Sequence, residues 1–210
     1  MYIIFKKYGA LAIGIFHLIG IIGLSSEYRG VFLNLTPVNL IASTIIIAFD
    51  LDKNNKRQLI FCLVCFFTCF FIEVIGVNTG IIFGEYEYGN TLGIKFLGTP
   101  LLIGVNWLLL ILSIGSMLSK VELNLFLKCI TSAFLMVFID FFIEPIAMIL
   151  DFWNWKNSNI PPLNYFAWFY ISLIIFFLYF KIFKNEDENK IIKYVYSIQL
   201  AFFLILNLIF

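Results

Sequence analysis

Two carboxylic acids stand four residues apart in a stretch that is otherwise apolar. Residues 135–155 read LMVFIDFFIEPIAMILDFWNW and include Asp140, Glu144 and Asp151. In a helix, at about 100° per residue, these three acids share one face. An ionisable group at membrane depth costs at least about 2.5 kcal/mol, so it faces the protein interior and marks a functional site by default. We therefore expect a buried acid pair, Asp140 and Glu144, that is suited to proton transfer.

The same helix could open space beside these acids. Pro145 directly follows Glu144, and a proline removes a backbone donor and can kink a helix. A kink next to a buried acid favours a cavity and hence a site. The alternative interpretation is a polar clamp, in which the acids only form hydrogen bonds between helices.

A third carboxylate, Glu73, precedes a glycine-rich segment at a similar expected depth. Residues 73–100 read EVIGVNTGIIFGEYEYGNTLGIKFLGTP and contain six glycines. Such glycines interrupt regular helix and predict a folded-back loop with close backbone approaches. If GEYEYGN is extended, Tyr86 and Tyr88 share one face. A belt of aromatic residues at the membrane interface would explain these tyrosines equally well.

The two acidic regions repeat a common order of residues. Each has a glutamate, an aromatic loop, a proline, an asparagine and a tryptophan, on a helix that leads outward and one that leads back. The first set is Glu73, Pro100, Asn106 and Trp107, and the second is Glu144, Pro161, Asn164 and Trp168, with Trp153 and Trp155 in the second loop. Parallel repeats place sites at their interface, so both halves are expected to line one polar pocket.

Membrane-spanning helices must position these residues. Apolar residues make up 62% of the 210-residue chain and charged residues 13%, which is far outside soluble-protein usage. Roughly 17–25 apolar residues cross a bilayer as a helix. The sequence predicts seven spans at about 8–25, 36–51, 58–77, 100–118, 128–150, 164–181 and 193–210. The expected fold is one all-α transmembrane bundle over residues 1–210, without a separate soluble domain.

The basic residues predict how the bundle is oriented. Eleven of the 14 Lys and Arg lie in the N-terminus and the second, fourth and sixth connections, whereas Arg29, Lys95 and Lys156 are alone in the other three. Cytoplasmic loops retain positive charge, so we expect a cytoplasmic N-terminus and an outer C-terminus in a bacterial or archaeal cell membrane. With a net charge of +1, these residues are topological signals and do not indicate nucleic-acid binding.

The sequence contains no motif for a metal, flavin or nucleotide, and no cofactor is expected. Cys62, Cys65 and Cys69 share a helix face, but apolar packing explains them better than a metal site, because further ligands are missing nearby. His17, the one histidine, is expected to be a packed, hydrogen-bonded imidazole in the first span. It is left out of the predicted site.

Two segments of the chain, over about residues 70–170, resemble the membrane-type carotenoid hydratases, which include the bisanhydrobacterioruberin hydratases. Two positions depart from the pattern of that family: an aspartate is usual where Glu144 stands, and a glycine where Ala167 stands. The matching residues are Glu73, Gly76, Thr79, Gly80, Phe83, Gly84, Tyr86, Tyr88, Leu92, Gly93, Gly98, Pro100 and Trp107, and then Asp140, Pro145, Ala147, Trp153, Trp155, Pro161, Asn164, Phe166 and Trp168.

The resemblance implies addition of water across the terminal 1,2 double bond of an acyclic carotenoid end group. Protonating an alkene requires a carboxylic acid that is still neutral, and burial beside a second carboxylate favours the neutral acid. Asp140 and Glu144 meet both conditions, and Glu73 could accept the proton of the attacking water. The expected partners are the carotenoid, water and membrane lipid, together with other carotenoid-pathway enzymes.

The remaining candidates bind substrate in this interpretation. Ring faces stabilise a tertiary cation, because cation–π attraction can exceed about 2 kcal/mol in a desolvated site. The two asparagines could hold the water. The expected substrate-binding residues are Tyr86, Tyr88, Trp107, Trp153, Trp155 and Trp168, with Asn106 and Asn164.

Two other functions remain open on the sequence alone. A carotenoid cyclase begins with the same protonation but ends with proton loss, so its product is an isomer of the substrate. A carboxylate-lined transporter or a seven-helix photoreceptor belongs to another class. The last span, YVYSIQLAFFLILNLIF, has no lysine for a retinal Schiff base, which argues against the photoreceptor.

Overall fold

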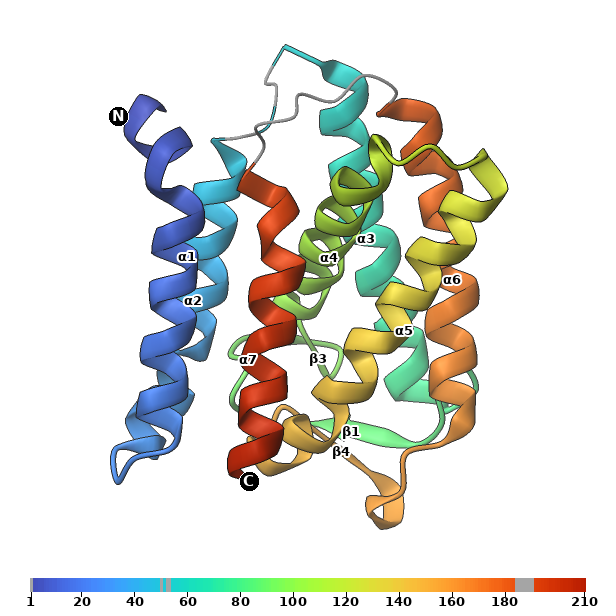
Figure 1. Cartoon of the computed structure of the whole chain (residues 1–210). Coiled ribbons are helices and arrows are strands. Elements are labelled where there is room, and N and C mark those ends of the chain that lie inside the picture. The colour runs from blue at the N-terminus through green and yellow to red at the C-terminus, as the bar shows by residue number, and fades with distance from the viewer. Residues whose placement is uncertain (1, 50, 52–53, 184–190) are drawn as a thin grey trace.

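The computed structural model of the chain describes residues 2–49, 51, 54–183 and 191–210, with side chains from Tyr8 onward. The described chain is an all-α bundle, as predicted (Figure 1). Six of its helices, counted within the described residues, are long and apolar enough to cross a membrane, and α1 adds a shorter apolar stretch, Tyr8–Leu24. The helices are α1 (Tyr2–Leu24), α2 (Arg29–Ala48), α3 (Lys56–Thr79), α4 (Leu101–Ser119), α5 (Leu125–Ile149), α6 (Pro162–Ile182) and α7 (Val195–Ile209), the last preceded by the 3-10 turn Ile191–Tyr194.

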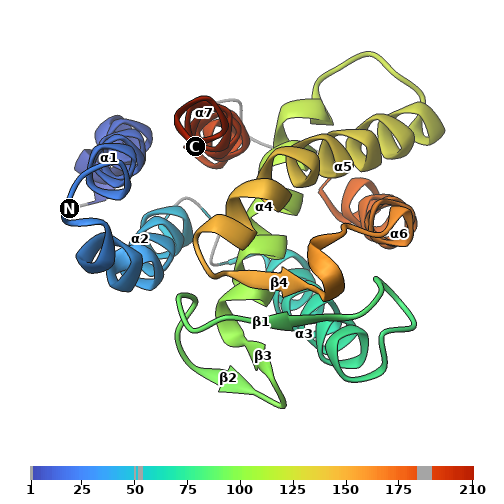
Figure 2. The ribbon, with the colours of Figure 1, turned by 90° about the horizontal axis from the view of Figure 1, so that it is seen from below.

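α4 is the central helix of the bundle. It packs against α2, α3, α5, α6 and α7, and most of its length is buried. Seen along the helix axes, α3 to α6 form one group, while the α1–α2 hairpin stands to one side next to α7 (Figure 2). The molecule therefore has a four-helix part that carries the predicted site and a second part made of α1, α2 and α7.

Short strands cross one end of the four-helix part. β1 (Tyr86–Tyr88) pairs antiparallel with β4 (Trp153–Trp155), so that Tyr86 faces Trp155 and Tyr88 faces Trp153. β2 (Lys95–Phe96) pairs with β3 (Thr99–Pro100). The centre of the GEYEYGN segment is therefore extended, which is the condition under which Tyr86 and Tyr88 share one face. The α3–α4 connection, which contains β1 to β3, and the α5–α6 connection, which contains β4, both lie at the end of the bundle that holds the C-terminus, opposite the N-terminus (Figure 1).

The glycine-rich loop leaves α3 through a left-handed residue, as its composition predicts. Gly80, at φ +67°, caps α3, and its N–H donates to the Gly76 carbonyl. Gly84 has φ +111°, and a Cβ there would stand 2.6 Å from Pro161 Cγ. Only glycine combines this backbone conformation with so close an approach. The first loop can therefore lie directly against the start of α6.

The prediction for Asp151 is wrong, because α5 ends before it. Asp151 is exposed, at φ +53°. The Phe152 N–H donates to the Ala147 carbonyl at 2.8 Å and the Asp151 N–H to Met148 at 3.4 Å. This pattern is a Schellman cap, whose left-handed position aspartate tolerates better than most residues. The Asp151 carboxylate instead accepts from the Asn90 N–H at 3.0 Å, which joins the two loops outside the acid pair.

The predicted start of the second span, near residue 36, is also wrong. α2 begins at Arg29 and contains Pro37. A proline inside a transmembrane helix is tolerated, although Pro37 leaves the Leu33 carbonyl without its usual helical donor. The helix thus continues through a sequence that indicated a helix start.

Candidate active site

Glu73 lies buried near the end of α3 and accepts three hydrogen bonds. The hydroxyls of Tyr86 and Tyr88 each donate to its Oε2 at 2.7 Å, and the Trp107 indole Nε1 donates to its Oε1 at 2.8 Å. Hydrogen bonds to a carboxylate are roughly twice as strong as neutral ones. This cluster therefore fastens β1 and α4 to α3.

The two tyrosines act only as donors to Glu73. Burial, followed by the Glu73 carboxylate, raises the pKa of both Tyr86 and Tyr88 far above the usual range of a phenol. Both hydroxyls thus stay protonated at any pH at which the protein works.

Glu144 and Asp140 are buried on one face of α5, as predicted, and are joined by an amide. Asn164 Nδ2, on α6, donates to Asp140 Oδ2 at 2.7 Å and to Glu144 Oε1 at 2.9 Å. The indoles of Trp153 and Trp155 both donate to Glu144 Oε2, at 3.0 and 2.6 Å. Asp140 Oδ1 is buried and has no hydrogen-bond partner among the described residues.

Aromatic rings enclose these acids. The ring centroids of Tyr86 and Trp155 lie 4.9 Å apart, and those of Tyr88 and Trp153 lie 6.1 Å apart. Trp107, on α4, stacks on Trp168, on α6, at 4.0 Å and 24°. Two acids that are 71 residues apart in the sequence are therefore surrounded by rings, and the polar atoms of five of these rings donate to one carboxylate or the other.

A cavity of about 20 Å³ lies between the two glutamates. A water molecule needs about 10–15 Å³ of such space and two to four polar partners, so this cavity has room for about one water. Ten of the eleven predicted site residues line it, whereas Asp140 lies behind and contacts the lining through Asn164. The lining is Glu73, Phe83, Tyr86, Tyr88, Ile103, Asn106, Trp107, Ile143, Glu144, Trp153, Trp155, Asn164 and Trp168.

A family model described as carotenoid biosynthesis protein matches residues 35–210. The chain belongs to this family. The predicted membership of a carotenoid biosynthesis family is thus confirmed, and the match covers the whole site. The chain has no significant match among curated proteins or solved structures.

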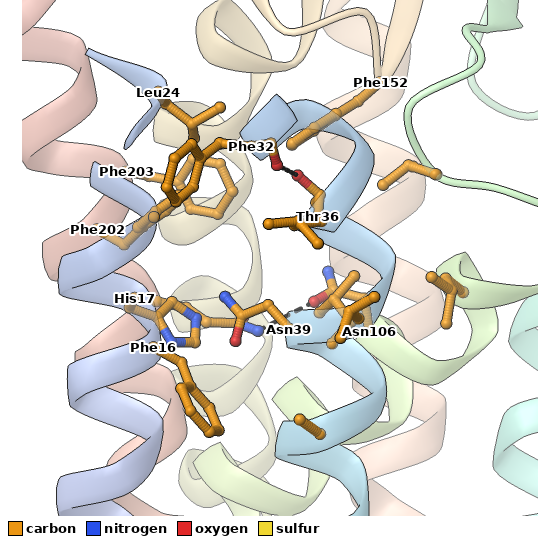
Figure 3. Close-up of a pocket in the computed structure, with 18 of the residues that line it drawn as sticks. Phe16, His17, Leu24, Phe32, Thr36, Asn39, Asn106, Phe152, Phe202 and Phe203 are labelled. Carbon is orange, nitrogen blue, oxygen red and sulfur yellow. Dashed lines mark hydrogen bonds between the residues drawn. The ribbon is translucent and has the colours of Figure 1, made fainter. Parts of the chain in front are cut away.

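A second, larger cavity adjoins the first in this carotenoid biosynthesis protein. It has a volume of about 240 Å³ and lies between α1, α2, α4 and α7. Its lining is mainly apolar (Figure 3). Ile103, Asn106, Ile143 and Trp153 line both cavities, so they form the boundary between a small polar space and a larger apolar space.

Asn106 was predicted to hold the attacking water, but it lines the larger cavity as well as the small polar one. Asn106 lies on this boundary, and its Oδ1 accepts a hydrogen bond from Gln199 Nε2 on α7 at 3.2 Å. The two asparagines of the repeat are therefore not equivalent, because Asn164 joins the acid pair and Asn106 faces the larger cavity. Gln199 was missed by sequence reasoning. A buried amide in an apolar span was the available signal.

The described residues contain no group of three or more His, Cys, Asp or Glu that could hold a metal ion. The four cysteines are buried. The chemistry available at the site is therefore that of buried carboxyl groups, indole and phenol donors and an amide.

Proposed function

We propose that this carotenoid biosynthesis protein is a hydratase that adds water across the terminal 1,2 double bond of an acyclic carotenoid end group. The observation that carries the proposal is the pair of adjoining cavities. One is polar, contains two glutamates and has room for one water, and the other is apolar and larger. A reaction that joins water to a hydrocarbon requires these two environments side by side.

The hydrocarbon reaches the site from the lipid. Phe16, Ile19, Leu35 and Val38 line the larger cavity, and between 38% and 57% of each side chain is exposed. On a bundle of membrane-spanning helices such exposure faces acyl chains. An end group therefore enters between α1 and α2 without crossing water, and its polyene chain extends into the bilayer.

Glu144 is the acid in this proposal. Of the two acids on α5, only Glu144 lines the cavity, while Asp140 is held to it by Asn164. One proton shared by Asp140 and Glu144 leaves a single negative charge on this pair. Glu144 gives this proton to C2 of the end group, and the π electrons form the new C–H bond. A tertiary cation remains at C1.

Water then attacks the cation at C1 and loses a proton to Glu73, which gives the tertiary alcohol. The rings of Trp153 and Trp155 stabilise the cation while it exists. The water that refills the cavity contacts both glutamates and returns the proton from Glu73 to Glu144. The net reaction consumes one water and needs no cofactor, and positioned acids and bases of this kind typically contribute about 10²–10⁴ in rate.

Expression in a host that accumulates carotenoids with acyclic ends tests this proposal. The expected pigment is heavier than its precursor by the mass of one water for each end that reacts. A product of unchanged mass with a new ring would indicate a cyclase. Unchanged pigment at a confirmed protein level would contradict any enzymatic reaction at these ends, and solute flux in reconstituted vesicles would then support a transporter.

We also propose that Glu73 and Glu144 lie in the outer half of the membrane. The distribution of Lys and Arg supports this orientation. Reporters fused after Lys56 and Lys120 should therefore be cytoplasmic, and those after Glu87 and Asn157 should be outside. A cytoplasmic reporter after Glu87 would reverse the orientation and place the water cavity near the cytoplasm.

A further inference from the structure

Three polar side chains converge in the larger cavity, away from the acids. His17 lies on α1 and Asn39 on α2 (Figure 3). Gln199 lies on α7, and all three residues line the cavity. His17 is 7% exposed and Gln199 is 3% exposed. No Asp, Glu, Lys or Arg lines this cavity within the described residues. The proposed reaction uses none of these three residues.

The hydrogen bonds of this cluster leave acceptor atoms without donors. His17 Nδ1 lies 2.8 Å from the Ile13 carbonyl. A carbonyl only accepts, so Nδ1 carries the proton and Nε2 of the neutral ring is an acceptor. Asn39 Oδ1 and Gln199 Oε1 are buried and have no partner among the described residues. A buried acceptor without a donor is costly, and two of them on separate helices, beside the acceptor nitrogen of His17, point to a ligand that donates.

We infer that the larger cavity binds an isoprenoid end group that carries a hydroxyl, and that this hydroxyl donates to the cluster of His17, Asn39 and Gln199. A hydroxyl supplies the missing donor, whereas an alkene, an ether or a ketone does not. A charged ligand is disfavoured, because the lining has no ionised side chain to pair with it. The inference rests on the proposed function only for the isoprenoid nature of the ligand.

The position of the cluster relates the hydroxyl to the reacting end. Gln199 donates to Asn106, and Asn106 also lines the water cavity. A hydroxyl held by Gln199 therefore lies next to the boundary that a reacting end must cross. Two sources are compatible with this chemistry: the tertiary hydroxyl that hydration has just formed, or a hydroxyl that the carotenoid already carries.

Binding of small isoprenoids to the purified full-length protein in lipid nanodiscs tests the inference without turnover. Three probes share one skeleton: 2,6-dimethyloctan-2-ol, which has the product-like tertiary hydroxyl, 3,7-dimethyloctan-1-ol, which has a primary hydroxyl, and the hydrocarbon 2,6-dimethyloctane. Tryptophan fluorescence reports binding, because Trp153 lines the cavity. We expect at least one alcohol to bind about tenfold or more tightly than the hydrocarbon, since a site built for a hydroxyl rejects the analogue that lacks it.

Substitutions locate the preference. Asn39→Leu and Gln199→Leu should each reduce the ratio of alcohol to hydrocarbon affinity towards one, while hydrocarbon binding is kept. Asn34→Leu, at an exposed position on α2, is the matched control for Asn39→Leu and should keep the ratio. Asn39, which is only partly buried, provides the test if Gln199→Leu does not fold.

The preferred alcohol identifies the source of the hydroxyl. Tighter binding of the tertiary alcohol supports recognition of the hydrated end, and tighter binding of the primary alcohol supports recognition of a hydroxyl brought by the substrate. Equal binding of hydrocarbon and alcohols overturns the inference, and so does an alcohol preference that survives Asn39→Leu. If pigment hydration fails while the alcohols bind selectively, the proposed reaction is wrong and the hydroxyl site stands.

Discussion

The two halves of the site use the same plan to hold a glutamate and differ in what they add to it. In the first half, both tyrosines of β1 donate to one oxygen of Glu73. In the second, both tryptophans of β4 donate to one oxygen of Glu144. β1 and β4 pair antiparallel, so one short ribbon supplies aromatic donors to both carboxylates.

The differences lie at two matched positions. Asp140 stands four residues before Glu144, where the first half has Cys69 before Glu73. Asn164 stands three residues after Pro161, where the first half has Ile103 after Pro100. The second half therefore contains an extra acid and the amide that joins it to Glu144. The two halves therefore differ in the role we propose for their glutamate. Glu73 is a single carboxylate that accepts hydrogen bonds from aromatic residues, whereas Glu144 belongs to a pair of acids that can hold a proton.

The largest expected effect is that of Glu144→Gln, which keeps the shape of the side chain but removes the acidic proton. Hydration should fall by about 10²–10⁴, the usual contribution of a general acid, and unhydrated carotenoid should accumulate in cells that make the protein at the normal level. Glu144→Asp should keep part of the activity, because it retains an acid. If Glu144→Gln gave nearly normal amounts of product, another group would have to supply the proton. Glu144 and Glu73 would then not have the different roles proposed here.

A smaller effect is expected for Asp140→Asn, because Asp140 acts on the cavity only through Asn164. The loss should be about 10- to 100-fold, comparable to one hydrogen bond to a charged group, and the pH profile of hydration should shift as the shared proton is lost. Cys69→Asn, at the matched position of the first half, is the control. A larger loss in activity from the control than from Asp140→Asn would mean that the extra acid has no special role.

The first half should respond through stability. Tyr88→Phe removes one of the three donors to Glu73, which should lower the free energy of unfolding by about 1–3 kcal/mol, measured by thermal denaturation of the purified protein in detergent. Tyr28→Phe, at a tyrosine that is 69% exposed, should change it little. An unchanged melting temperature for Tyr88→Phe would show that Glu73 does not depend on its aromatic donors.

The smallest effect is expected at the rim, where Lys156 and Glu85 form an ion pair between the two loops. Both side chains are more than 60% exposed, and exposed pairs contribute at most about 1 kcal/mol. The backbone N–H of Lys156 also donates to the backbone carbonyl of Glu85 at 3.0 Å, and Lys156→Ala keeps both of these groups. Lys156→Ala should therefore leave hydration and the melting temperature nearly unchanged. A strong loss of activity would indicate that the ribbon is held from its rim and not by the two glutamates.

The sequence predicted most of the site because acids are rare in apolar spans. Glu73, Asp140 and Glu144 each mark a buried position by chemical type alone, and the two-residue period of a strand placed Tyr86 and Tyr88 on one face. The order of the repeat then placed the second tryptophans and asparagine beside the first set. Each of these inferences depends on local spacing or on the membrane as solvent.

The remaining features depend on packing between distant segments. The left-handed cap at Asp151 follows from hydrogen bonds of the loop after α5, which a helical projection ignores. The larger cavity is formed by α1, α2 and α7 around α4. His17, Asn39 and Gln199 each look like an isolated polar residue in its own span. Their convergence becomes visible only when three helices are placed.

The volume of the polar cavity has a consequence for which molecules can trap the cation of the proposed reaction. A space of about 20 Å³ admits water but excludes methanol and larger alcohols, although all of them attack a tertiary cation. Selectivity among nucleophiles thus arises from size before any difference in reactivity matters. A cell rich in alcohols or lipid hydroxyls would still obtain a free carotenoid alcohol, and ethers would not form at this site.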